Sequence, residues 1–283
     1  MKINRLLLII IFCLIILKGF AQSDSLKQKR MIYGIGYSHF RLLDQQNSPL
    51  IYRGHLLDLN IGFEKIKIDK SIFNVKLNLV GGIANSKRNE QQKVINYYYD
   101  ENNVLHKEII PLVHPELLIN LSTEYLIKYK NLLDNKATLY VGGQIREFFH
   151  ILYLATWGFD MPSILNEFTL NPKLLFEYKF NDLNKFNTSL SFPVFGLITR
   201  LPYSNVPMIE KYGPFMAVFK GGTNFSAINK YQRFDIELGW EKVINIKWNI
   251  HINYCFMWLH FPEVLSIKAY SNTLEFQFIR KLK

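Results

Sequence analysis

Cysteine is scarce in this sequence, which has only Cys13 and Cys255 among its 283 residues. Two cysteines cannot build a disulfide scaffold or a cysteine-based zinc site. Glycine (15) and proline (10) occur at ordinary counts, which excludes a collagen-like or linker-dominated chain. Charged residues make up 20 % of the chain and hydrophobic residues 49 %, and this balance is too apolar for intrinsic disorder. The chain therefore folds, and its stability must come from hydrogen bonding and packing.

One uninterrupted apolar run of note occurs, at residues 6–17, after a basic start that contains Lys2 and Arg5. It is well short of the ~20 residues that a membrane-spanning helix needs. A basic start, a short apolar core and a small residue before a polar stretch are the parts of a secretory signal peptide. We predict a signal peptide over residues 1–21, cleaved after Ala21, and a retained anchor is the alternative.

Helical periodicity is absent after residue 21, and alternation of apolar and polar residues replaces it. In residues 57–64 every odd position is apolar, and in residues 246–256 every even position is apolar. Such segments predict about ten strands. Their spans are 31–42, 53–67, 71–84, 109–130, 136–150, 166–180, 184–198, 231–243, 245–260 and 267–281. Several exceed the ~9–11 residues that a tilted strand needs to cross a membrane.

The connections between these strands alternate in length, with short links at 68–70, 131–135, 181–183 and 244. The long links include 85–108, 151–165 and 199–230. Short turns at one end and long loops at the other are typical of outer-membrane barrels. We predict an all-β fold, a transmembrane antiparallel up-and-down β-barrel of about ten strands, with eight to twelve as the range. Its parts would be the signal peptide, a periplasmic segment at 22–30 and the barrel at 31–283, located in the outer membrane.

The polar faces of the strands carry acids and bases together. These residues are Asp58, Glu64, Lys76, Glu124, Arg146, Glu177, Lys179, Asp235, Glu237, Lys247, His251 and Glu275. A barrel of about ten strands has a narrow lumen, so we expect them to form a lumen polar network in which opposite charges pair and fill the interior. A turn centred near Ile244 would place Glu241 opposite Lys247 and Glu237 opposite His251. Aromatic residues such as Tyr37, Tyr52 and Tyr254 lie toward strand ends, which is typical of an interface girdle.

Segments 20–22 (FAQ) and 47–54 (NSPLIYRG), together with the alternating strands, carry a resemblance. The chain resembles a family of outer-membrane β-barrels from Bacteroidota-type, Gram-negative bacteria. The resemblance implies a fold and a location, and it implies no activity.

Motifs of the enzymatic barrels are missing from the sequence. Omptin-like proteases activate water with an Asp-x-Asp pair opposite an Asp-x-His pair, and neither pair occurs here. Outer-membrane phospholipases and lipid A deacylases use a His-x-Ser, and no histidine of this chain has a serine two positions later. His114 and His150 are expected to point inward, whereas His39, His55 and His260 share parity with lipid-facing residues. We therefore predict no catalytic residues, no metal site and no cofactor.

The charge of the chain indicates its partners. The net charge is +11, and removing residues 1–21 leaves about +8. Because Lys and Arg are scattered, the sequence favours phosphate on outer-membrane lipid and lipopolysaccharide over nucleic acid. The barrel-assembly machinery is a further expected partner. The leading hypothesis is a non-enzymatic barrel with a structural, surface-binding or narrow-passage role. An outer-membrane hydrolase acting on lipid or peptide at the outer rim, with His150 or His251 as base, and a soluble periplasmic barrel or sandwich are the alternatives.

Overall fold

The structure is a computed structural model of the chain. It describes residues 27–45, 50–68, 70–86, 93–99, 101, 104–111, 114–134, 136–153, 162–200, 211–212, 216, 220, 222–262 and 265–282. The predicted signal peptide lies outside the described residues, as do residues 22–26 of segment 22–30 and residues 47–49 of the motif at 47–54.

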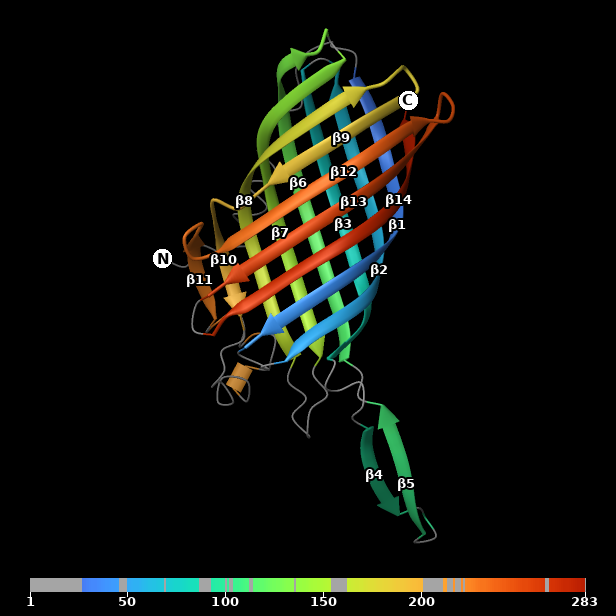
Figure 1. The fold of residues 1–283 in the computed structure, drawn as a ribbon. Coiled ribbons are helices and arrows are strands. Elements are labelled where there is room, and N and C mark those ends of the chain that lie inside the picture. The colour runs from blue at the N-terminus through green and yellow to red at the C-terminus, as the bar shows by residue number, and fades with distance from the viewer. Residues whose placement is uncertain are drawn as a thin grey trace.

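Ten antiparallel strands close into a barrel, which confirms the predicted fold class (Figure 1). They are β1 (Lys27–Asp44), β2 (Ile51–Lys67), β3 (Ser71–Ser86), β6 (His114–Leu132), β7 (Ala137–Tyr153), β8 (Pro162–Lys179), β9 (Asn184–Ser191), β12 (Gln232–Val243), β13 (Trp248–Phe261) and β14 (Ile267–Leu282). Each pairs with its neighbours in sequence, β1 pairs with β14, and the β8–β9 pairing completes the ring. The β8–β9 pairing closes the ring of ten strands, as a barrel in lipid requires.

Short turns gather at one end of the barrel and long connections at the other (Figure 1). We call these the turn end and the loop end. The turn end holds the links at 68–70, 133–136, 180–183 and 244–247. At the loop end, β4 (Lys93–Tyr99) and β5 (Leu105–Pro111) form a separate two-stranded sheet, where a long loop was expected over 85–108. Residues 109–111, expected to begin the strand 109–130, belong to β5 instead.

The barrel wall is irregular where β9 gives way to β10 (Phe195–Arg200). β8 pairs with β9 up to Lys173↔Ser191 and then with β10 from Leu170↔Phe195, so the register shifts by one residue. Pro193 lies at this break and has no N–H to donate to the ladder. β10 pairs on its other side with β11 (Thr223–Ala227), and residues 228–231 separate β11 from β12. The expected single strand 184–198 is thus two strands, and β11 was not predicted.

Several strand boundaries differ from the predicted spans, and two of these differences change an expectation stated above. β1 begins at Lys27, so residues 27–30 belong to the barrel and not to a periplasmic segment. The turn between β12 and β13 spans residues 244–247, with Glu241 opposite His251 and Glu237 opposite Cys255. The Asn245 side chain explains the wider turn, because its oxygen accepts hydrogen bonds from the Lys247 and Trp248 amides at 2.8 and 2.9 Å. The predicted Glu241–Lys247 and Glu237–His251 pairs were therefore wrong.

The outward face of the strands is apolar. Ile35, Leu59 and Phe276 lie side by side on β1, β2 and β14 and are about half exposed. Soluble monomers rarely expose a continuous apolar surface of this kind. Among the described residues, no helix is both long and apolar enough to span a membrane.

Candidate functional site: the barrel lumen

The lumen of the barrel is occupied by ion pairs along much of its length. Within the described strands, seven cations pair with nine carboxylates. The cations are Arg30, Lys76, Arg146, Lys173, Lys185, Arg200 and Arg233, and the carboxylates are Asp44, Glu64, Glu124, Glu167, Glu177, Asp235, Glu237, Glu241 and Glu275. Seven of these eleven pairs join strands that are not neighbours in the wall and so cross part of the lumen, whereas Arg30–Glu64, Lys185–Glu177, Lys185–Glu241 and Arg233–Asp235 lie within one strand or between adjacent strands.

Nearest the turn end, Arg30 and Lys185 share Glu241. The Arg30 Nη1 lies 3.2 Å from Glu241 Oε1, and the Lys185 Nζ lies 3.0 Å from Glu241 Oε2. Arg30 also pairs with Glu64 at 3.4 Å, and Lys185 pairs with Glu177 at 2.9 Å. The cluster joins β1 and β2 to β8, β9 and β12 across the interior.

Two lysines neutralise carboxylates in the middle of the lumen. Lys173 Nζ lies 2.7 Å from Glu124 Oε2 and 3.4 Å from Glu237 Oε2. Lys76 Nζ lies 3.0 Å from Glu275 Oε2, and Glu275 is 1 % exposed. Glu275 also accepts hydrogen bonds from the side-chain amides of neighbouring asparagine and glutamine residues. Buried charges of this kind are stable only when they are paired and hydrogen-bonded in this way.

A third cluster lies closer to the loop end, where Arg233 is fully enclosed. Its guanidinium pairs with Glu167 at 2.8 Å and with Asp235 at 2.9 Å, and Arg146 pairs with Asp235 at 2.6 Å. The Tyr231 hydroxyl donates to the same Glu167 Oε2 oxygen that accepts from Arg233. At the loop end itself, Arg200 pairs with Asp44 at 2.5 Å and donates to the backbone oxygen of residue 265 at 2.7 Å.

The loop-end half of the lumen is packed with apolar side chains, which we call the loop-end apolar cluster. Its buried members are Phe40, Leu42, Tyr52, Leu56, Ala84, Leu118, Phe148, Leu152, Leu165, Ile198, Tyr231, Met257, Leu259, Phe261, Ile267 and Ala269. A core packed to ordinary density has few voids larger than a water molecule. This cluster therefore fills part of the lumen with side chains in addition to the ion pairs.

His150 and Glu116 form a buried pair within the loop-end apolar cluster. His150 Nε2 lies 2.8 Å from Glu116 Oε1, and both side chains are 1 % exposed. The other contacts of His150 in the described part of the chain are the rings of Phe40 and Phe148. The hydrolase alternative requires an acid or serine within reach of an inward histidine, and Glu116 is such an acid. No hydroxyl or thiol among the described residues contacts His150 to serve as a nucleophile.

Two small cavities remain between the ion pairs, with volumes of about 100 and 110 Å³. Lys76, Ser122 and Glu237 line both of them, so the two cavities share one layer of the lumen. Each can hold several water molecules.

The structure places ten of the twelve residues of the lumen polar network inside the barrel. Lys179 and Lys247 are exposed at the turn end instead, because each lies at or beyond the end of its strand. His251 lies inside, but its partners are Gln277 at 2.9 Å and Asn187 at 3.4 Å, so the expected bond to Glu237 was wrong. No group of three His, Cys, Asp or Glu side chains in the described residues could hold a metal ion.

Sequence reasoning missed the loop-end apolar cluster and the charged residues within it, among them Glu116, Glu167 and Arg233. A signal was present in apolar pairs such as Leu56-Leu57 and Leu117-Leu118. Two adjacent apolar residues in a strand place one on each face, so both the lipid side and the lumen side are apolar there. Tyr52 was expected in an aromatic girdle. It lies at an even position of β2, where side chains point inward, and it packs against His114 inside the barrel.

Comparison with known proteins gives structural likeness only, since no protein family and no curated protein matches the sequence. The chain is similar to the outer membrane protease OmpT from Escherichia coli, with 7 % identity, a TM-score of 0.46, and coverage of 90 % of this chain and 96 % of that one. It is similar to an outer membrane channel from Pseudomonas putida F1, with 9 % identity, a TM-score of 0.42, and coverage of 93 % and 98 %. Neisserial surface protein A gives 9 % identity, a TM-score of 0.35, and coverage of 89 % and 97 %. At these values no function is transferred from any of the three.

Proposed function

We propose that this protein is an outer-membrane β-barrel with a closed lumen, which acts as a structural or surface-binding protein and not as an enzyme or an open pore. The observation that carries the proposal is the double closure of the interior. Ion pairs such as Lys76–Glu275 cross the middle of the lumen, and the loop-end apolar cluster occupies much of its other half. Water-filled porins leave the lumen open, and they need more strands to do so.

The membrane location is supported by the distribution of polarity around the wall. Apolar side chains face outward and charged side chains face inward, which is the reverse of a soluble barrel or sandwich. In such barrels the short turns face the periplasm and the long loops face the exterior. The proposal therefore orients the loop end outward. Export by a signal peptide and a Bacteroidota-type, Gram-negative origin belong to the same proposal, on the sequence evidence given above.

Location is tested by fractionating cells and comparing boiled with unboiled samples by gel electrophoresis. We expect the protein in the detergent-extracted outer membrane, with a mobility that changes on heating. Recovery in the osmotic-shock fraction would favour the soluble periplasmic alternative.

Closure is tested by reconstituting the folded barrel in planar bilayers in concentrated KCl, with a sixteen-stranded porin as the positive control. We expect no stable single-channel steps from this protein. Large and stable steps would overturn the closed-lumen proposal while leaving the membrane location intact.

The His150–Glu116 pair keeps the hydrolase as a second candidate, because the two side chains have a base–acid geometry. Their position in an apolar interior favours a structural role for the pair. Ester and peptide substrates, offered to wild type and to His150→Asn, distinguish the two. Turnover by wild type that disappears in the variant would support the hydrolase, and equal background rates would support the structural role.

A further inference from the structure

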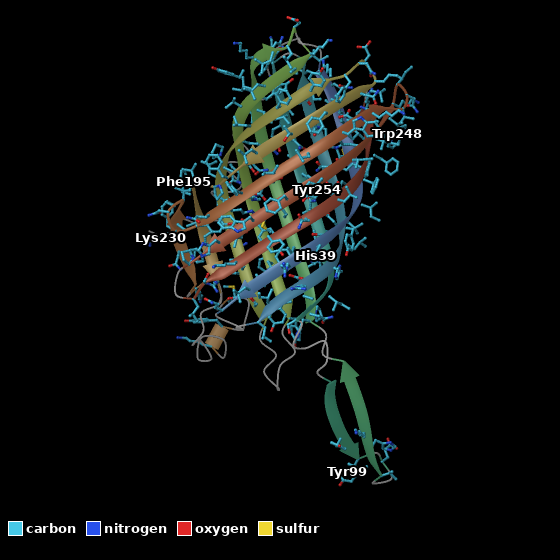
Figure 2. The ribbon with its side chains drawn as sticks, in the orientation of Figure 1. His39, Tyr99, Phe195, Lys230, Trp248 and Tyr254 are labelled. Carbon is cyan, nitrogen blue, oxygen red and sulfur yellow. The ribbon has the colours of Figure 1, made fainter. Side chains whose placement is uncertain are left out.

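The outward surface of β13, β14, β1, β2 and β3 is ordered in rows of directly paired residues. Near the middle of the barrel the rows are apolar, and one of them contains Tyr254, Leu274, Tyr37 and Leu57. The next row toward the loop end contains Asn272, His39 and His55. The row after that contains Tyr270, Arg41, Arg53 and Asn85. Figure 2 shows His39 and Tyr254 on the same side of the barrel, with His39 nearer the loop end.

Arg41 and Arg53 face each other directly across β1 and β2. Like charges in directly opposed positions destabilise a sheet unless something neutralises them. Among the described residues, the outward positions of these five strands contain no Asp or Glu, and neither arginine forms an ion pair. His39 and His55 lie in the neighbouring outward row toward the turn end, with ring centroids 5.1 Å apart. Lys268 on β14 lies in the next outward row toward the loop end. Within the described strands the patch is therefore cationic and contains no acidic side chain.

Contacts with Tyr270 fix the position of the Arg41 guanidinium. Its Nη1 donates to the Tyr270 hydroxyl, and its guanidinium carbon lies 5.1 Å from the centre of the Tyr270 ring. Its Nε is buried and has no hydrogen-bond partner. A guanidinium fixed by an aromatic ring presents its donors in a geometry that fits the oxygens of phosphate.

Two tyrosines mark the depth of this patch in the membrane. The Tyr37 hydroxyl bonds to His55 Nδ1, and the Tyr254 hydroxyl donates to Asn272 at 2.6 Å. Both rings thus lie in an apolar row, with their hydroxyl groups directed toward the polar row above. Tyrosine takes this orientation at the boundary between acyl chains and head groups. The arginine pair then lies at head-group level at the loop end.

We propose that Arg41, Arg53 and Lys268, together with His39 and His55, bind the phosphate groups of a phosphorylated glycolipid in the outer leaflet, as lipid A of lipopolysaccharide presents them. The inference rests on the proposed outer-membrane location. The cations are spread over β14, β1 and β2, which suits a head group with more than one phosphate. The occupant is a lipid because the patch is continuous with the apolar rows that would contact its acyl chains.

The test uses the full-length barrel, purified in detergent and judged folded by its heat-dependent gel mobility. Phosphorylated and dephosphorylated lipid A are titrated and detected by native mass spectrometry. The variant is Arg41→Gln with Arg53→Gln. The control is Lys29→Gln with Lys65→Gln, which removes two cations from directly opposed outward positions on the same two strands at the turn end.

We expect wild type and the control to bind phosphorylated lipid A equally, and the arginine variant to bind it about thirtyfold more weakly, since each basic side chain near anionic lipid contributes about a factor of five. Dephosphorylated lipid A should bind wild type as weakly as the variant binds the phosphorylated form. An Arg41→Lys, Arg53→Lys variant provides a folded comparison if the glutamine variant does not fold, and it should retain most of the binding.

Three outcomes would contradict the proposal. Equal binding by wild type and the arginine variant would show that Arg41 and Arg53 do not bind the phosphate groups. Displacement of the lipid by millimolar inorganic phosphate would mean that the patch recognises free phosphate and not a lipid. Loss of binding in the lysine control alone would place the site at the turn end. Absence of lipid binding by every form, together with recovery outside the outer membrane, would instead indicate failure of the proposed location.

Discussion

Replacing Lys173 by Met tests whether the lumen ion pairs hold the barrel together. Lys173 Nζ lies 2.7 Å from Glu124, and the side chains are 6 % and 10 % exposed. At an effective dielectric constant of about 20, the attraction at this distance is about 6 kcal/mol before the cost of desolvation is subtracted. The substitution leaves Glu124 and Glu237 without their shared cation, and an uncompensated buried charge costs about 3–5 kcal/mol. Because the adjoining cavity can admit water, we expect a loss near 3 kcal/mol.

A double-mutant cycle isolates the pair. Glu124→Gln leaves Lys173 with Glu237 and should cost about 1–2 kcal/mol. The double variant removes the cation and one carboxylate together, so it should be less destabilised than the sum of the two single changes by about 1.5 kcal/mol or more.

The measurement is the free energy of unfolding in lipid vesicles, from denaturant titrations followed by tryptophan fluorescence. Lys179→Met is the matched control, because this lysine is exposed at the turn end and should change stability by less than about 0.5 kcal/mol. Additivity of the two lumen substitutions within about 0.5 kcal/mol would refute the reasoning, because independent sites behave in that way.

Two further predictions concern the backbone of the barrel and its loop end. Gly142→Ala should lower the free energy of unfolding by about 1–3 kcal/mol, because a Cβ there meets the Tyr125 carbonyl oxygen, whereas Gly143→Ala should be tolerated, since the nearest atom outside its chain neighbours is 3.7 Å away. Equal stabilities in the same denaturant titration would contradict this. Replacing residues 92–112 by a short Gly-Ser linker should leave the heat-dependent gel mobility unchanged, because β4 and β5 pair only with each other. Loss of the folded band would show that the hairpin contributes to the barrel.

The barrel itself could be predicted from the sequence because two independent patterns agree. Alternation in segments such as 57–64 gives the strands, and the alternating loop lengths give the order of the ends. Side-chain parity then assigns each face, which is why Asp58 and Glu275 lie inside as expected. Because successive side chains of a strand point to opposite faces, the residues that face inward are fixed once the outward residues are known.

The partners of these side chains could not be predicted, because register depends on turn geometry that alternation does not encode. The Asn245 side chain widens one turn, and Glu241 then faces His251 instead of Lys247. Pairs across the lumen, such as Arg30–Glu241, depend on the curvature and tilt of the whole wall. The register break at Pro193 likewise creates β10 from what reads as one continuous strand.

The positive charge of the chain is not located in the lumen, and this bears on what the charge is for. Inside the described strands nine ion-paired carboxylates outnumber seven ion-paired cations, so these pairs do not hold the surplus of basic residues, part of which lies on the outer surface and the rims. At the turn end it includes Lys29, Lys65 and Arg280, and at the loop end it includes Arg41 and Arg53. A basic pore would instead carry unpaired cations along its interior. This distribution favours the proposed contact with lipid head groups on both sides of the barrel over a role in the passage of anions.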